Sequence, residues 1–301
     1  MENRSSATAA RRQGTGGSIG RLLALVAVVC ATVAACASPA GGAPLLPTPV
    51  AAASPSSSGP TSTAPPRPDV FTTGLDVGHD HEAGLWLSWS VVDRDDGRRI
   101  GSKNSGTDRT NAESSIKAWI AADRLRVDAA AGRRVSQANR ELIERAVRAS
   151  DDEAAEDLYR PLGADAVLRD LKTVCGVGIA TSRRGYWSYA QITAQDATRI
   201  LDCVLTKAPT YTDGGLLVDA LHDVDTDDRF GIPEALPPGT AVAVKNGWTA
   251  HSATGLWNLN CVASWNQYTL AVLTRYPMGR GEGYGAAVCK DVTAKFLAKA
   301  G

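Results

Sequence analysis

Two serines and two lysines in this chain have the types and spacing that nucleophilic chemistry requires. Ser114 and Lys117 stand three residues apart in Asn111-Ala-Glu-Ser-Ser-Ile-Lys117, so on a helix they would share one face. A serine hydroxyl is a weak nucleophile until a neighbouring base takes its proton. Lys117 can act as that base only where burial or another cation lowers its pKa. The pair predicts acyl transfer through a serine.

Two later segments could complete such a site. Ser150-Asp151-Asp152 supplies a second hydroxyl, for which we predict a proton relay. Lys245-Asn246-Gly247-Trp248 supplies a second cation, predicted to support the relay and to orient a substrate carboxylate. The N-terminal end of the Ser114 helix and the backbone N–H groups of Ser114 and Trp248 are expected to stabilise an oxyanion.

Each segment alone has a simpler explanation. A serine and a lysine at a helix start can both be solvated, and Ser150-Asp151-Asp152 suits a helix end followed by an N-cap. Lys245-Asn246-Gly247 suits a strand that runs into a turn. The three motifs in this order carry the prediction, because S-x-x-K, S-D-N and K-T-G or their variants occur together in penicillin-interacting serine hydrolases.

The elements that must position these residues follow from hydrophobic periodicity. A hairpin is expected over 85–103, turning at Asp95-Asp96-Gly97, and strands over 242–244, 255–264 and 268–275. Helices are expected over 114–125, 137–149 and 153–159, after the break at Pro161-Leu-Gly163 as far as Leu171, from the Thr193 capping box to Leu205, from Gly215 to His222, and over 285–298. Strands, a block of helices and then strands again predict an α+β domain with an antiparallel sheet.

The N-terminal region is predicted to be a lipoprotein signal peptide over 1–35. Arginines precede the 14-residue apolar run Leu22 to Ala35, which is too short to span a bilayer comfortably. Val33-Ala34-Ala35-Cys36 resembles a bacterial lipobox, with lipidation at Cys36, whereas bulky Val29 makes Cys30 a poorer candidate. The alternative is an ordinary secretory peptide with a chance cysteine. A lipidated cysteine, carrying palmitate-type chains, would anchor the protein stably to a membrane.

Residues 36–69 are predicted to be a tether and residues 70–301 one folded domain. The tether is rich in Pro, Ser and Ala and cannot bury a core. Removal of residues 1–35 leaves 28 basic and 31 acidic side chains, a net charge of −3. No basic run follows, so nucleic acid is not expected as a partner.

Four further cysteines are predicted to form two disulfides in an exported protein. Their connectivity has three alternatives, of which we favour Cys175–Cys203 and Cys261–Cys289. No cofactor and no metal site is expected, since His79-Asp80-His81-Glu82 falls in a polar loop that should be solvated and His222 and His251 are isolated in sequence.

At these motifs the chain resembles the serine β-lactamase and penicillin-binding superfamily. It more closely resembles the actinobacterial β-lactamase-like, alanine-rich lipoproteins, through Tyr186-Trp187-Ser188, Arg229-Phe-Gly-Ile-Pro233 and Lys245-Asn-Gly-Trp248. The resemblance covers about residues 85–301. It implies a class A β-lactamase-like fold, with an antiparallel sheet, flanking helices and an all-helical lobe, and a site between sheet and lobe.

Several departures from the family pattern bear on activity. Asp152 stands where the family has asparagine, and Asn246 where it has a threonine that helps to hold a substrate carboxylate. Ser114 and Ser150 are only 36 residues apart, which predicts a trimmed helical lobe. Residues 173–188 contain no carboxylate where the family carries a deacylating glutamate. Efficient β-lactam turnover is therefore not expected, and Asp152 should favour the charged form of Lys117.

Two functions remain open from sequence. The first is a monomeric envelope lipoprotein, exported and anchored to the outer face of the cell membrane, that acts as a serine acyl hydrolase on peptidoglycan-type peptides or related acyl compounds. Its site would comprise Ser114, Lys117, Ser150 and Lys245, with Asp152, Asn246, Gly247 and Trp248 around the cleft. The second is a non-catalytic lipoprotein on the same fold that binds cell wall or a protein.

Overall fold

The computed structural model describes residues 69–79 and 82–300. The predicted signal peptide, Cys36 and all of the predicted tether except residue 69 lie outside the described residues. The described residues belong to one compact unit, Thr63–Gly301. None of the helices in this described part is long and apolar enough to cross a membrane.

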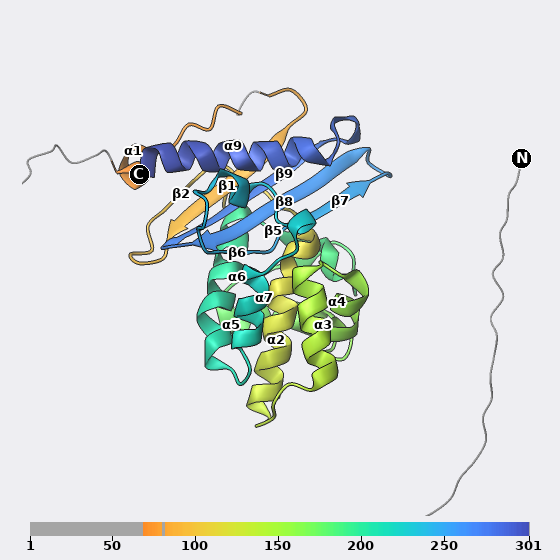
Figure 1. Cartoon of the computed structure of the whole chain (residues 1–301). Helices are drawn as coiled ribbons and strands as arrows, with labels where there is room; N and C mark the ends of the chain where they lie inside the picture. The colour runs from red at the N-terminus through yellow and green to blue at the C-terminus, as the bar shows by residue number, and fades with distance from the viewer. Residues whose placement is uncertain (1–68, 80–81, 301) are drawn as a thin grey trace, which may run out of the picture. The chain divides into compact units, whose positions relative to one another are not determined.

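An antiparallel sheet forms the middle layer (Figure 1). The predicted hairpin is present as β1 (Trp86–Asp93) and β2 (Arg99–Gly101), and Gly97 supplies the positive φ of 76° that its turn requires. Next to β1 lies β9 (Tyr268–Pro277), and next to β9 lies β8 (Leu256–Trp265). Two short strands, β6 (Val242–Val244) and β7 (Gly247–His251), share the far edge of β8.

Helices cover both faces of this sheet. The C-terminal helix α9 (Glu282–Ala300) lies across one face, and a helical lobe lies under the other (Figure 1). α6 (Ala194–Lys207) packs directly against β1, β8 and β9 and so joins the sheet to the lobe. The expected α+β architecture is therefore confirmed. The other helices of the lobe are α2 (Lys117–Ala130), α3 (Gln137–Arg148), α4 (Asp152–Tyr159), α5 (Asp165–Cys175) and α7 (Gly215–His222).

Two hydrophobic cores hold these layers together. Val292 and Phe296 of α9 pack with Val91 and Val272 on one face of the sheet. The second core fills the helical lobe and the opposite face of the sheet, with Trp119 fully buried in it. Burial of each such large side chain contributes about 1.5–3 kcal/mol. The clusters fix the lobe against the sheet, and the predicted motifs lie at this junction.

Local sequence signals set several element boundaries. The predicted capping box is present at α6, where Thr193 Oγ1 accepts from the N–H of Asp196 and Asp196 accepts from the N–H of Thr193. The sequence did not indicate a small second sheet of β3 (Thr110–Asn111), β5 (Ala190–Ile192) and β4 (Ala180–Thr181). Shorter elements are α1 (Val70–Thr73), α8 (Ile232–Ala235) and the 3-10 turns Glu113–Ile116, Trp187–Tyr189, Ala208–Thr210, Thr226–Asp228 and Met278–Arg280.

Both favoured disulfides are confirmed. Cys175–Cys203 joins the end of α5 to α6, with a Cα–Cα distance of 5.7 Å. Cys261–Cys289 joins β8 to α9, with a Cα–Cα distance of 6.3 Å. The first bond therefore joins two helices of the lobe, and the second ties the sheet to α9. Gly231 packs so closely on the second bond that an added Cβ would lie 2.7 Å from Cys261 Sγ.

Candidate active site

Ser114 lies on a 3-10 turn that leads into α2. The turn spans Glu113–Ile116, and the α-helix begins at Lys117. The helix predicted from Ser114 therefore begins one turn later than expected. A φ of 49° at Glu113 turns the chain sharply just before the serine. Ser114 faces a cleft between the sheet and the helical lobe.

Lys117 points from the first turn of α2 toward the loop between α3 and α4. Its Nζ donates to the carbonyl of Ser150 at 2.5 Å and to Asp152 Oδ1 at 2.6 Å. The ring of Trp187 lies 4.8 Å from the same nitrogen, a cation–π contact. Among the described residues, these groups rather than the hydroxyl of Ser114 occupy the lysine nitrogen.

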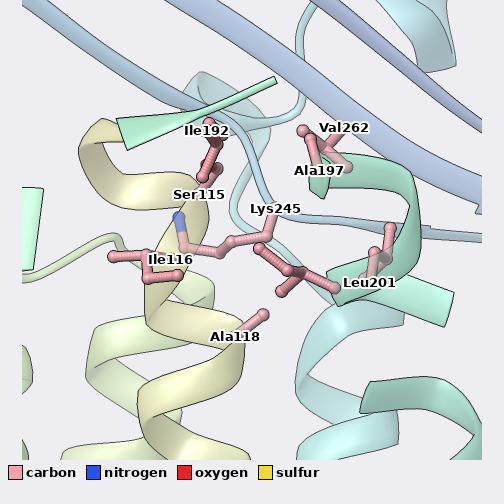
Figure 2. A pocket seen from close by; sticks show the side chains of 9 residues that line it. Ser115, Ile116, Ala118, Ile192, Ala197, Leu201, Lys245 and Val262 are labelled. Carbon is pink, nitrogen blue, oxygen red and sulfur yellow. The ribbon is translucent and has the colours of Figure 1, made fainter. Parts of the chain in front are cut away.

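Lys245 follows the end of β6 and enters the site from the sheet side. Its Nζ donates to Ser150 Oγ at 2.8 Å, and the side chain is only 1 % exposed. Figure 2 shows the side chain between Ile116 and Leu201. These residues line a small cavity of about 10 Å³. Apolar walls around the stem therefore hold the ammonium group in place and keep water away from it.

Burial lowers the pKa of both lysines. For Lys245, burial and the nearby charge of Lys117 bring the pKa to about 7, against the opposing charges of Asp228 and Asp152. For Lys117, burial lowers the pKa although the hydrogen bond to Asp152 acts in the other direction. Asp152 thus favours the charged lysine as expected, but burial is the larger effect. A lowered pKa makes the neutral, basic form of each lysine more accessible than it is for a solvated lysine.

Asn246 has a different place from the one its sequence position suggested. It is 1 % exposed, and its amide group donates to the carbonyls of Asp228 and Phe230 at 3.1 Å each. Its Oδ1 accepts from the N–H of Val262 at 3.2 Å, a β8 donor at the break between β6 and β7. Asn246 therefore does not line the cleft and acts as an internal brace.

Gly247 allows β7 to approach the serine turn. A Cβ at this position would lie 2.5 Å from the backbone nitrogen of Ser115 and 2.7 Å from that of Ser114. No side chain fits at such distances. Trp248 follows on β7 and lines the cleft with its ring against Phe230 at 5.1 Å. The strand and the serine turn are thus in direct contact, the arrangement that an oxyanion pocket from two backbone segments requires.

The cleft has a volume of about 410 Å³ and brings most of the predicted residues together. Ser114, Ser150, Asp152 and Trp248 line it, with both lysines buried beneath. A second hollow of about 450 Å³ continues from it and shares Asp152, Trp187 and Ser188. The other residues that line the cleft are Glu113, Ala149, Tyr189, Asp228, Thr249 and His251.

Three residues of the site were not predicted from the sequence. Glu113 and Asp228 were not singled out, although both line the cleft. His251 was considered isolated, yet its Nε2 lies 2.7 Å from Glu113 Oε1, a contact across 138 residues of sequence. Only the proximity of His251 to the Lys245-Asn246-Gly247 motif could have indicated that it faces the same cleft.

The described residues contain no group of three or more metal-ligating side chains with suitable geometry. His79 of the polar loop instead contacts two carboxylates, Glu82 and Asp291, at 2.9 Å each. Three serines and several carboxylates line the cleft, with the two buried lysines beneath them.

The fold is that of the class A β-lactamases. A class A β-lactamase from Mycobacterium abscessus matches with a TM-score of 0.57 and 21 % identity, over 71 % of this chain and 94 % of the other. An ancestral class A β-lactamase, GNCA, matches at 0.56 and 23 %, over 72 % and 95 %. A β-lactamase from Chitinophaga pinensis DSM 2588 matches at 0.58 and 16 %, over 72 % and 94 %.

Among curated proteins, the chain is similar to "Putative lipoprotein LppW" of Mycobacterium tuberculosis and of Mycobacterium bovis. The identity is 29 % over 179 residues, 55 % of this chain and 54 % of each relative. The chain thus spans about half the length of the curated relatives it matches. No protein-family model matches the chain.

Proposed function

We propose that this protein is a serine acyl-transfer enzyme of the cell envelope, with Ser114 as its nucleophile. One observation carries the proposal: two lysines, 0 % and 1 % exposed, lie beneath the serine cleft and both contact Ser150. Burial of charged groups is costly and is retained mainly where chemistry uses it. A purely structural lobe–sheet junction would be more stable with apolar residues at these positions.

In the proposed acylation step one bond forms, one bond breaks and three protons move. Neutral Lys117 takes the proton of Ser114 Oγ, and the oxygen forms a bond to the substrate carbonyl carbon. The backbone N–H groups of Ser114 and Trp248 stabilise the oxyanion. The bond to the leaving group then breaks, and Ser150 Oγ gives that group a proton. Charged Lys245 supplies a proton to Ser150 across their 2.8 Å hydrogen bond, so Lys117 ends the step protonated and Lys245 neutral.

Release of the acyl group is proposed to be slow. Trp187 lies against Lys117 and donates its indole N–H to Glu156 Oε2 at 3.1 Å. The same carboxylate pairs with Arg160. Glu156 is thus engaged away from Ser114, and residues 173–188 supply no carboxylate for water activation. An acyl-enzyme formed here should persist, which disfavours rapid β-lactam turnover.

The substrate class and location rest on the resemblance and on the relatives. We propose a peptidoglycan-type peptide or a related acyl compound, and a monomer held at the outer face of the cell membrane by lipid on Cys36. The name of the curated relatives supports the anchor. Cys36→Ala should release the protein from membranes, and unchanged membrane fractionation of that variant would refute the anchor.

A non-catalytic binding lipoprotein is the second candidate. The contact between Lys117 and Asp152 favours it, because an ammonium paired with a carboxylate at 2.6 Å cannot accept a proton. On that account the cleft would hold a cell-wall fragment or a protein segment without reacting. The choice depends on whether substrate binding separates Lys117 from Asp152.

Covalent labelling tests the two functions. The protein would be treated with a fluorophosphonate and with a fluorescent penicillin, and adducts would be located by peptide mass spectrometry. We expect an adduct on Ser114 in the wild type and in Ser188→Ala, which removes another serine of the same cleft. Ser114→Ala should abolish labelling. A wild type that stays unlabelled from pH 6 to 9 would favour the binding protein.

A further inference from the structure

Glu113 is a buried carboxylate immediately before the proposed nucleophile. Its side chain is 3 % exposed although the residue borders the cleft, and its backbone adopts a φ of 49°. A non-glycine residue keeps such a conformation only where its surroundings impose it. The proposed mechanism gives Glu113 no part in proton transfer, so its burial needs another explanation.

Three side chains of the sheet converge on this carboxylate. Thr249 Oγ1 donates to Oε2 at 3.0 Å, and His251 Nε2 lies 2.7 Å from Oε1. Both residues belong to β7, which also carries Trp248. From β8, the amide of Asn258 donates to Oε1 at 3.2 Å. Glu113 therefore joins the serine turn to the edge strand β7 and to its neighbour β8.

A neighbouring contact holds the same turn from the β8 side. The amide of Asn260 donates to the carbonyls of Asn111 at 2.8 Å and Ala112 at 3.1 Å. Asn260 is fully buried, so these bonds are shielded from water. With Glu113, they fix three consecutive residues before Ser114 to the sheet.

The backbone contact at Gly247 lies between these side-chain contacts. The space for a Cβ there is already filled by the nitrogens of Ser114 and Ser115. The Ser114 turn and β7 are not linked covalently near this contact, so only non-covalent contacts fix their relative position. That position decides where an oxyanion would bind. A shift of about 1 Å in such a site can cost 100-fold in rate.

We propose that Glu113 is a positioning residue that sets the oxyanion pocket, by tying the Ser114 turn to β7 through Thr249 and His251. The inference rests on the proposed acyl transfer through Ser114. Glu113 itself does not touch the substrate. Loss of its bridge should let the N–H groups of Ser114 and Trp248 separate, so acylation slows while the cleft still binds the reagent.

Matched variants separate this role from a contribution to stability alone. Glu113→Met keeps the length of the side chain but removes every acceptor. Glu113→Gln keeps an acceptor oxygen that can serve His251 and Asn258, so it should rescue much of the function. Thr274→Val is the control, because Thr274 is a buried sheet residue with one hydrogen bond, to Leu259 at 2.8 Å, outside the serine turn.

Saturation kinetics of fluorophosphonate labelling provide the first readout. Glu113→Met should lower the limiting acylation rate roughly 10- to 100-fold with little change in the half-saturating concentration. Thr249→Val should lower it by less, and Glu113→Gln should stay within about threefold of the wild type. Thr274→Val should lower the melting temperature without changing acylation. Equal acylation in Glu113→Met and the wild type would overturn the proposal.

Hydrogen exchange provides a second readout that needs no activity. In Glu113→Met, amides of residues 111–116 and 247–251 should exchange at least tenfold faster than in the wild type, while α9 stays unchanged. If Glu113→Met does not fold, Thr249→Val replaces it in the same comparison. If the wild type resists labelling, the proposed acyl-transfer function fails, but hydrogen exchange still tests whether Glu113 positions the Ser114 turn. Unchanged exchange in both segments of Glu113→Met would refute the positioning role of Glu113.

Discussion

Lys117 and Asp152 form an ion pair between a completely buried lysine and a carboxylate whose side chain is 79 % exposed. The asymmetry is informative, because an exposed carboxylate can rotate into water while the lysine cannot. When it does, Lys117 loses the partner that favours its charge. A bound ligand can therefore displace Asp152 from Lys117. The lysine would then be free to act as the base in catalysis, although it is paired in this structure.

Asp152→Asn should speed labelling of Ser114 near neutral pH. Burial lowers the pKa of Lys117 and Asp152 opposes that effect, so removal of the carboxylate lowers the pKa further. The neutral, basic form of Lys117 then exists at lower pH. The pH profile of the labelling rate should move to lower pH, so labelling on the acidic side of the wild-type profile should be faster.

Glu153→Gln is the control for this prediction. It removes a negative charge from the next residue of α4, which is exposed and does not contact Lys117. Its profile should match the wild type. Identical profiles for Asp152→Asn and the wild type across pH 6–9 would refute the electrostatic role of Asp152.

Lys245→Met should stabilise the protein while it impairs labelling. The pKa of Lys245 falls from 10.5 to about 7 on folding, so the unfolded chain binds an extra proton between these values. The free energy of unfolding therefore rises with pH between about 7 and 10.5. Below pH 7 Lys245 is charged in the folded protein, and its burial lowers the free energy of unfolding by the full amount. Replacement of such charges by apolar groups can stabilise by about 1–4 kcal/mol.

Urea unfolding at several pH values measures this effect. The gain in Lys245→Met over the wild type should be largest at pH 6 and should shrink toward pH 10. Lys290→Met on the exposed side of α9 should show no such trend. A variant that is destabilised equally at every pH would show that the charge of Lys245 is not costly.

Much of the fold could be predicted because its signals are local. The hairpin turn at Asp95-Asp96-Gly97, the capping box at Thr193 and the long apolar strands each depend on neighbouring residues. The short strands β3, β4 and β5 have two or three residues, too few for a period to be read. The disulfide pairing was favoured from adjacent elements and is confirmed.

The site was predictable only in part, because its contacts join distant segments. The motif order indicated that Ser114, Ser150 and Lys245 would meet, and they line or underlie one cleft. Nothing local indicates that Glu113 contacts His251 or that Trp187 covers Lys117. Asn246 was placed in the cleft by analogy, whereas the break between β6 and β7 turns its side chain inward.

Gly247→Ala should reduce both stability and labelling. The added Cβ would meet two backbone nitrogens within 2.7 Å, and backbone atoms cannot move aside as a flexible side chain can. Overpacking of this kind costs about 1–3 kcal/mol, and the displaced turn should slow acylation at least tenfold. Gly215→Ala, in open space at the start of α7, is the control and should be neutral or slightly stabilising. Wild-type labelling in Gly247→Ala would contradict the close contact.

The two disulfides should differ in their accessibility to reductants. Cys261 and Cys289 are fully buried, whereas Cys175 and Cys203 are partly exposed. Mild reduction of the folded protein should therefore open Cys175–Cys203 first. Thiol trapping followed by peptide mapping would follow this order over time, and simultaneous loss of both bonds would show that reduction requires global unfolding.

Each bond closes a loop with a separation of 28 residues, so removal of either should lower the free energy of unfolding by about 3–4 kcal/mol through chain entropy.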